Sequence, residues 1–132
     1  MIGNYGEVHL HRLTDYEIRC SERYRRFFSL VFMTSGNGQV EFRKLLGDLL
    51  RTSDEFIELE GFSSILMSET DKTAALEAVS RFEELQMGSV DVRYSIASFP
   101  EDGKSSLELL LRASDRLDKA KDRDEGAIVS DE

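Results

Sequence analysis

The chain has 132 residues, enough for one domain with its own hydrophobic core. Hydrophobic residues make up 40% and charged residues 33% of it, as in ordinary globular proteins. No apolar run reaches the ~18–20 residues that a membrane span needs, and the chain does not begin with a signal-peptide pattern. The single cysteine, Cys20, cannot form an internal disulfide, and a net charge of −9 argues against broad binding to nucleic-acid phosphates. We therefore expect a cytoplasmic protein that contacts neither membrane nor nucleic acid.

The first segment, residues 1–12, shows no clear hydrophobic period, and we expect an N-terminal extension there. It contains both histidines, His9 and His11, with no acidic or cysteine partner at ligand spacing, so we predict ordinary polar residues and no metal site. The tetrad Thr14-Asp15-Tyr16-Glu17 has the form of a capping box and predicts that a helix starts there.

Aromatic side chains recur along this first predicted helix. They form one stripe with the cysteine, and we expect the stripe to pack against the rest of the protein: Tyr16, Cys20, Tyr24 and Phe27. Arginines cluster on its other faces, and acidic residues crowd the segment 122–132, which we interpret as an acidic tail. Both charge clusters are typical of solvated surface.

The next two elements have clear periods. The nearly continuous apolar run Phe28–Met33 predicts a central strand that is buried on both faces, and Thr34–Gly38 predicts a loop. A helix follows, because apolar residues recur at helical spacing: Phe42, Leu45, Leu46, Leu49 and Leu50. Gly47 weakens this helix by about 1 kcal/mol, which we expect the stripe to offset.

The middle of the chain, residues 51–67, predicts two strands joined by a tight turn. Ile57 and Leu59 alternate with Phe56, Glu58 and Glu60 at the period of a strand. Glu60-Gly61 supplies the turn, because glycine adopts a positive φ without penalty. The residues 62–67 form the more apolar return strand.

The remaining elements complete the pattern. A helix is predicted over Thr70–Leu85, with Ala75, Val79 and Phe82 on its apolar face, and Gly88 follows its end. Alternation over 90–97 predicts a half-buried strand, and Phe99–Gly103 a loop. A second capping box, Ser105–Glu108, opens a helix to about Lys121. We expect its apolar face to contain Leu107, Leu110, Leu111, Ser114 and Leu117. Gly126 ends that pattern, and Ala127–Val129 is a candidate edge strand.

This order predicts an α+β fold. The core arrangement strand-helix-strand-strand-helix-strand is typical of ferredoxin-like domains, in which helices pack on an antiparallel sheet. We expect a single domain over residues 1–132.

Four stretches in the right order resemble GGDEF domains, the diguanylate cyclases. They are Arg23–Val31; the frame of Arg51-x-x-Asp54, five residues and a pentapeptide at Glu60-Gly61-Phe62-Ser63-Ser64; Ala97–Gly103, similar to Ala-Ser-(Tyr/Phe)-Pro-Glu-Asp-Gly; and Leu109–Lys121, similar to Leu-Leu-x-x-Ala-Asp-x-Ala-Leu-Tyr-x-Ala-Lys. The resemblance covers roughly Leu13 to Gly126 and implies an elaborated ferredoxin-like, nucleotide-cyclase-like fold.

The same resemblance implies that the catalytic residues are absent. The family joins two GTP molecules with metal held by carboxylates, one at the end of the first strand and one in the pentapeptide; Thr34 and Ser63 stand there. Glu60 replaces the first pentapeptide glycine and puts a negative charge where substrate phosphates would lie. A family segment of roughly twenty residues, with the Asn and Asp that recognise guanine, is reduced to Thr34–Gly38. Of the triphosphate contacts Lys121 persists, but Glu125 stands in place of an arginine.

These losses predict that the domain does not make cyclic di-GMP, and no other catalytic constellation is visible in the sequence. One feature survives. Arg51 and Asp54 match the family's inhibitory Arg-x-x-Asp site, which binds the product cyclic di-GMP and usually recruits a second arginine. The alternative is that the two residues close a helix and start a strand through a salt bridge or cap.

Three functions stay open at this point. The first is an inactive GGDEF-like signalling domain, without a cofactor, that acts through an unknown partner protein, with a homodimer possible. The second is a cyclic di-GMP receptor that uses Arg51 and Asp54. Residual nucleotide turnover is the third.

Overall fold

A computed structural model describes residues 5–36, 40–87 and 90–132. The elements are α1 (Tyr5–Tyr24), β1 (Phe28–Ser35), α2 (Phe42–Leu46), β2 (Asp54–Glu58), β3 (Ser63–Ser68), α3 (Lys72–Phe82), β4 (Val92–Phe99), α4 (Ser106–Lys121) and β5 (Ile128–Val129). A 3-10 turn, Gly47–Leu49, follows α2, and a π-helical turn, Glu83–Met87, follows α3. The predicted order of helices and strands is confirmed. Asn37, Gly38 and Gly88, which we assigned to loops, lie outside the described residues.

The strands form one five-stranded sheet in the order β2-β3-β1-β4-β5. Neighbouring strands are antiparallel except β4 and β5, which run parallel. The predicted α+β fold is confirmed, and the candidate edge strand makes the sheet mixed. The central strand β1 is buried on both faces, as its apolar run predicts.

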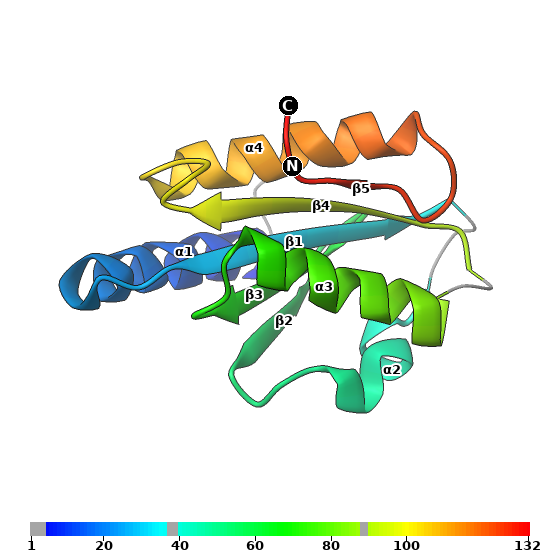
Figure 1. Ribbon diagram of the computed structural model, residues 1–132, viewed down its shortest axis with the longest axis horizontal. Coiled ribbons are helices and arrows are strands. Elements are labelled where there is room, and N and C mark those ends of the chain that lie inside the picture. Colours follow the sequence, from blue (N-terminus) through cyan, green and yellow to red (C-terminus); the bar gives the residue numbers. More distant parts are fainter. Residues whose placement is uncertain (1–4, 37–39, 88–89) are drawn as a thin grey trace.

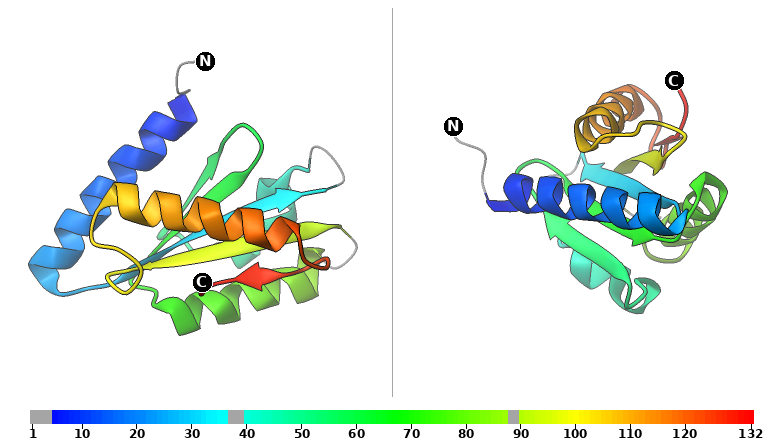
Figure 2. Two further views of the ribbon diagram at one scale, coloured as in Figure 1. Left: turned by 90° about the horizontal axis from the view of Figure 1, so that it is seen from above. Right: turned by 90° about the vertical axis from the view of Figure 1, so that its left-hand side faces the viewer.

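Helices cover both faces of the sheet (Figures 1 and 2). On one face α1 and α4 pack over a cluster that includes Leu30, Leu66 and Leu109. On the other face α2 and α3 enclose a second cluster, which includes Ile65, Val79 and Ile96. Successive residues of a strand point to opposite faces, so each strand contributes to both clusters.

The start of α1 differs from the prediction. The helix begins at Tyr5, and the segment read as an aperiodic extension forms its first turns. Thr14 does not cap a helix, because it lies in the middle of one. Its hydroxyl donates to the carbonyl of Leu10, 2.7 Å away and one turn earlier.

The aromatic stripe of α1 does not pack as predicted. Tyr16 and Tyr24 are each 58% exposed, and Phe27 is 43% exposed. The helix instead buries a face that contains Leu10 and Ile18 with small polar residues, so hydrophobic spacing alone selected the wrong face.

The helix predicted after the first loop is short. It ends at Leu46, because Gly47 adopts a left-handed φ of +46° and closes the helix. The apolar residues beyond it continue in the 3-10 turn, so the stripe did not offset the glycine.

The last strand and helix of the core pack more closely than predicted. β4 is buried on nearly its whole length, not on one face only. The predicted capping box of α4 is confirmed, since the Glu108 amide donates to the Ser105 hydroxyl at 3.1 Å. The predicted apolar face is wrong, since Leu107 and Leu111 are each 60% exposed. The helix buries Leu109, Ala113, Arg116, Leu117 and Ala120.

The two edges of the sheet are protected differently. Along β2 the guanidinium of Arg43 donates to the Phe56 carbonyl at 3.1 Å and lies 4.7 Å from the centre of its ring. At the opposite edge, β5 lies inside the segment 122–132, so part of the predicted acidic tail belongs to the sheet.

Candidate functional site

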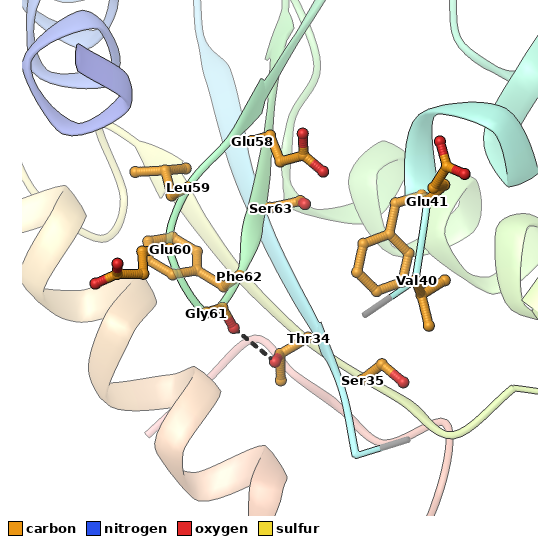
Figure 3. A pocket seen from close by; sticks show the side chains of 11 residues that line it. Thr34, Ser35, Val40, Glu41, Glu58, Leu59, Glu60, Gly61, Phe62 and Ser63 are labelled. Carbon is orange, nitrogen blue, oxygen red and sulfur yellow. Dashed lines mark hydrogen bonds between the residues drawn. The ribbon is translucent and has the colours of Figure 1, made fainter. Parts of the chain in front are cut away.

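An open cleft of about 690 Å³ lies where the β2–β3 hairpin, the end of β1 and the start of α2 meet. Its described lining is Thr34, Ser35, Val40, Glu41, Phe42, Glu58, Leu59, Glu60, Gly61, Phe62 and Ser63 (Figure 3). Five of the six positions that we assigned to a degenerate active site therefore line one cleft: Thr34, Glu60, Gly61, Phe62 and Ser63. The sixth, Ser64, is buried and does not.

The hairpin turn has the predicted geometry. Gly61 has a φ of +91°, which favours glycine over every other residue. The Thr34 hydroxyl donates to the Gly61 carbonyl at 2.9 Å and so ties the end of β1 to the turn (Figure 3). Phe62 packs on Phe32, with ring centres 4.7 Å apart, and fixes the other side of the turn.

Carboxylates and a hydroxyl dominate the cleft's polar groups. Glu58 and Ser63 are register partners across the hairpin, and both side chains face the cleft (Figure 3). Glu60 lines the cleft as well, with its carboxylate directed away from Thr34 and Ser63. Glu58 is the glutamate beside Ser63.

The residues present do not suit the family's metal chemistry. Neutral hydroxyls stand at the end of β1 and in the turn, and they are poor ligands for hard divalent cations. Within the described residues, no group of three or more His, Cys, Asp or Glu side chains is placed to hold a metal ion. Lys121 and Glu125 do not line the cleft, and the Lys121 ammonium lies 3.5 Å from the Asp118 carboxylate.

Arg51 and Asp54 lie at the end of the hairpin away from its turn and are bonded to each other. The Arg51 amide donates to Asp54 at 2.8 Å, and the Arg51 guanidinium donates to the other carboxylate oxygen at 3.2 Å. The same guanidinium donates to the Ser68 carbonyl and the Thr70 hydroxyl. The Asp54 side chain is only 3% exposed. This salt bridge, with Asp54 also accepting from the Arg51 amide, is the alternative to a ligand site that the sequence left open.

A second hollow, of about 240 Å³, lies beside this pair. Arg51 and Arg81 both line it, and so do Asp54, Glu69 and Glu77. Two guanidinium groups could contact a phosphate there, but the three carboxylates oppose an anion.

The sequence did not reveal a buried ion network at the other end of the sheet. Arg116 is 3% exposed and donates to the Ile96 carbonyl at 2.8 Å and to Asp102 at 2.9 Å. Asp102 also accepts from the Ser98 amide and from Lys72. The sequence contains one indication of this network: Arg116 stands where the C-terminal motif of the GGDEF resemblance has an alanine.

The network shifts the pKa of two of its groups. Burial raises the pKa of Asp102, but hydrogen bonds from Arg116, the Ser98 amide and Lys72 outweigh it and hold the pKa below 3.8. Burial lowers the pKa of Lys72, but the surrounding carboxylates of Glu101, Asp131 and Asp102 outweigh it and raise the pKa above 10.5. Both groups are therefore charged at neutral pH.

His11 has partners that spacing did not suggest. Its Nδ1 lies 3.3 Å from Asp15, and the Ser106 hydroxyl lies 3.4 Å from both ring nitrogens. A catalytic triad needs the serine and the carboxylate on opposite ring nitrogens. Here the Ser106 hydroxyl is equally far from both nitrogens and is not aligned with the nitrogen opposite Asp15, so we assign these contacts to the joining of α1 to α4.

Solved structures share this fold, although no protein-family model matches the sequence and no curated protein does. The GGDEF domain of YfiN (TpbB) from Pseudomonas aeruginosa is 19% identical, with a TM-score of 0.81, and the alignment covers 96% of this chain and 88% of that one. The active GGEEF domain of a Vibrio cholerae diguanylate cyclase is 11% identical with a TM-score of 0.78, covering 92% and 94%. The P. aeruginosa diguanylate cyclase SiaD, solved with its activator SiaC, is 16% identical with a TM-score of 0.79, covering 93% and 57%.

These similarities show that the chain has the GGDEF-domain fold, as its motifs predict. Over the described ranges 5–36, 40–87 and 90–132, none of the helices is both long enough and apolar enough to cross a membrane.

Proposed function

We propose that this chain is a catalytically inactive GGDEF-like signalling domain that acts by contact with a partner protein. The observation that carries the proposal is the cleft itself: Thr34 and Ser63 occupy the two positions where the resemblance places metal carboxylates. A hydroxyl supplies no negative charge to a magnesium ion, and the Thr34 hydroxyl already donates to Gly61.

The remaining charges also disfavour a nucleotide substrate. Glu58 faces the cleft, and none of its described lining residues is basic. A triphosphate would therefore meet negative charge without a cation to offset it. A protein partner fits better, and the solved complex of SiaD with its activator is a precedent for a protein with this fold.

The direct test is incubation of the whole chain with GTP and Mg²⁺ or Mn²⁺, followed by chromatography for cyclic di-GMP. We expect no product, and titration calorimetry should detect no GTP binding. An active GGDEF domain assayed beside it controls for the conditions. Product formation by this chain would refute the proposal.

A second candidate is a cyclic di-GMP receptor, because Arg51 and Arg81 line the same hollow. For phosphate to bind, Arg51 would have to exchange one of its present contacts. Calorimetry with cyclic di-GMP tests this: a receptor should bind, and Arg51→Ala should abolish the heat. Arg112→Ala is the matched control, since Arg112 is an exposed arginine on α4. Binding that survives Arg51→Ala would exclude this site.

A further inference from the structure

We propose that the cleft between the β2–β3 hairpin and α2 receives an arginine-bearing segment of a partner protein, with its guanidinium against Glu58 and Ser63. This rests on the proposed function, since it names the surface and the partner chemistry through which an inactive domain would act. It follows from three properties of the cleft: a hydroxyl that faces it without a protein partner, negative charge without a basic residue, and two adjacent acceptors beside an apolar wall.

The first property is the Ser63 hydroxyl. Ser63 is 3% exposed and lines the cleft, and Figure 3 shows its oxygen directed into the open space. None of the hydrogen bonds among the described residues involves this hydroxyl, and its oxygen is not enclosed by protein atoms. It is therefore free to accept a hydrogen bond from a donor that enters the cleft.

The second property is charge. Glu41 and Glu58 stand on opposite walls of the cleft, one from the start of α2 and one from β2 (Figure 3). No lysine or arginine is among the described lining residues, and residues 37–39, between β1 and α2, are Asn-Gly-Gln by sequence. Glu41 has a distant exposed partner in Lys44, at 3.6 Å, whereas the described residues offer Glu58 no ion pair. The site therefore favours a cation.

The third property is a pair of adjacent acceptors beside an apolar wall, and it favours a guanidinium over a metal ion or an ammonium. Glu58 and Ser63 are direct register partners, so a carboxylate and a hydroxyl acceptor lie side by side on one face of the hairpin. A planar guanidinium presents several donors in a fixed fork and can bond both acceptors at once. Val40 and Phe42 provide an apolar wall for the aliphatic stem or a neighbouring side chain.

The probe for this site is the peptide acetyl-Leu-Arg-Leu-amide, titrated into the ¹⁵N-labelled chain at low salt. The matched peptide carries citrulline instead of arginine, which keeps the shape and removes the charge. We expect saturable amide shifts at Glu58, Ser63 and Phe42 with the arginine peptide, and much smaller shifts with the citrulline peptide.

Variants separate this site from a general attraction to an acidic protein. Glu58→Gln should weaken binding roughly five-fold, within the range of an exposed ion pair and its hydrogen bond. Glu55→Gln is the control, because Glu55 is an exposed glutamate of the same strand on the opposite face. It should leave the affinity unchanged.

Three outcomes would overturn the inference: shifts scattered over the surface, equal effects of the two variants, or equal binding of the citrulline peptide. Shifts of the free chain that grow with its own concentration, at the cleft and at Arg23–Phe27, would also overturn it by making a second copy the occupant. All four outcomes leave the proposed function intact, whereas cyclic di-GMP synthesis would refute that function and not the peptide site.

Discussion

The ion network at one end of the central strand β1 and the cleft at its other end hold charge in opposite ways. Near Phe28, where the strand begins, Lys72 and Arg116 both bond the carboxylate of Asp102, and all three side chains are buried or nearly so. Near Thr34, where it ends, Glu58 and Glu41 face an open cleft. Charges inside a low-dielectric interior must be paired, so the first end tolerates little change. Exposed charges do not carry that constraint, so the cleft should tolerate substitution better than the ion network.

The largest expected effect comes from breaking the paired end. Arg116→Ala should lower the free energy of unfolding by about 3 kcal/mol, because it leaves a buried carboxylate short of its main partner. Urea denaturation followed by circular dichroism measures the change. Arg112→Ala, an exposed arginine on the same helix, should change stability by less than about 0.5 kcal/mol. Similar losses of unfolding free energy in both variants would mean that the buried Arg116 contributes no more to stability than an exposed arginine.

Acid should weaken the same end selectively. The pKa of Asp102 lies below 3.8 in the folded chain, so its contribution to stability is complete above that value and is lost as the pH falls through the lowered pKa. The stability gap between wild type and Asp102→Asn should be constant from about pH 5 to 7 and should narrow below pH 3.8. Denaturant titrations at each pH measure it. A gap that widens in acid would contradict the assigned shift.

At the open end, one hydrogen bond gives a smaller effect. Thr34→Val removes the donor to the Gly61 carbonyl and should cost about 0.5–1 kcal/mol of folding stability, since the contact is exposed. Thr34→Ser keeps the hydroxyl and should cost less. Thermal unfolding of the two variants, together with the Gly61 amide shift, compares them. Equal losses of stability in the two variants would mean that the hydrogen bond contributes no more than the methyl group of Thr34.

The smallest expected change in stability tests the contrast between the ion network and the cleft most directly. Glu58→Gln combined with Glu60→Gln should leave the free energy of unfolding within about 0.5 kcal/mol of wild type, because exposed charges contribute little. The same urea titration checks this. A loss above 2 kcal/mol would mean that these glutamates are retained for folding, and the contrast between the two ends would fail.

Sequence patterns predicted the elements well but not every buried face. In α4 the leucines suggested one face, yet the helix buries Ala113 and Ala120, because small residues allow close approach to β4. Arg116 then fills the space between them with bonds to backbone and carboxylate. A prediction from hydrophobic periodicity assigns leucines to the buried face before alanines and never assigns an arginine to it. It therefore could not identify the buried face of α4.

The site was predictable to a similar degree. The frame of the resemblance placed Thr34 at the end of the first strand and Ser63 at the hairpin turn, and the cleft lies where these two segments meet. It could not show that the Glu60 carboxylate points away from Ser63 while Glu58 lies beside it, since side-chain direction at a turn depends on the conformation of Gly61. Nor could spacing show that Arg51 and Asp54 already satisfy each other.

The guanidinium of Arg43 has a consequence for solubility. It occupies a carbonyl and covers a ring along the outer edge of β2, where a foreign strand would otherwise attach. The sheet is thereby discouraged from growing by stacking one molecule on the next. Concentrated solutions of the chain should accordingly stay free of fibrils, and loss of that single side chain should be the shortest route to them.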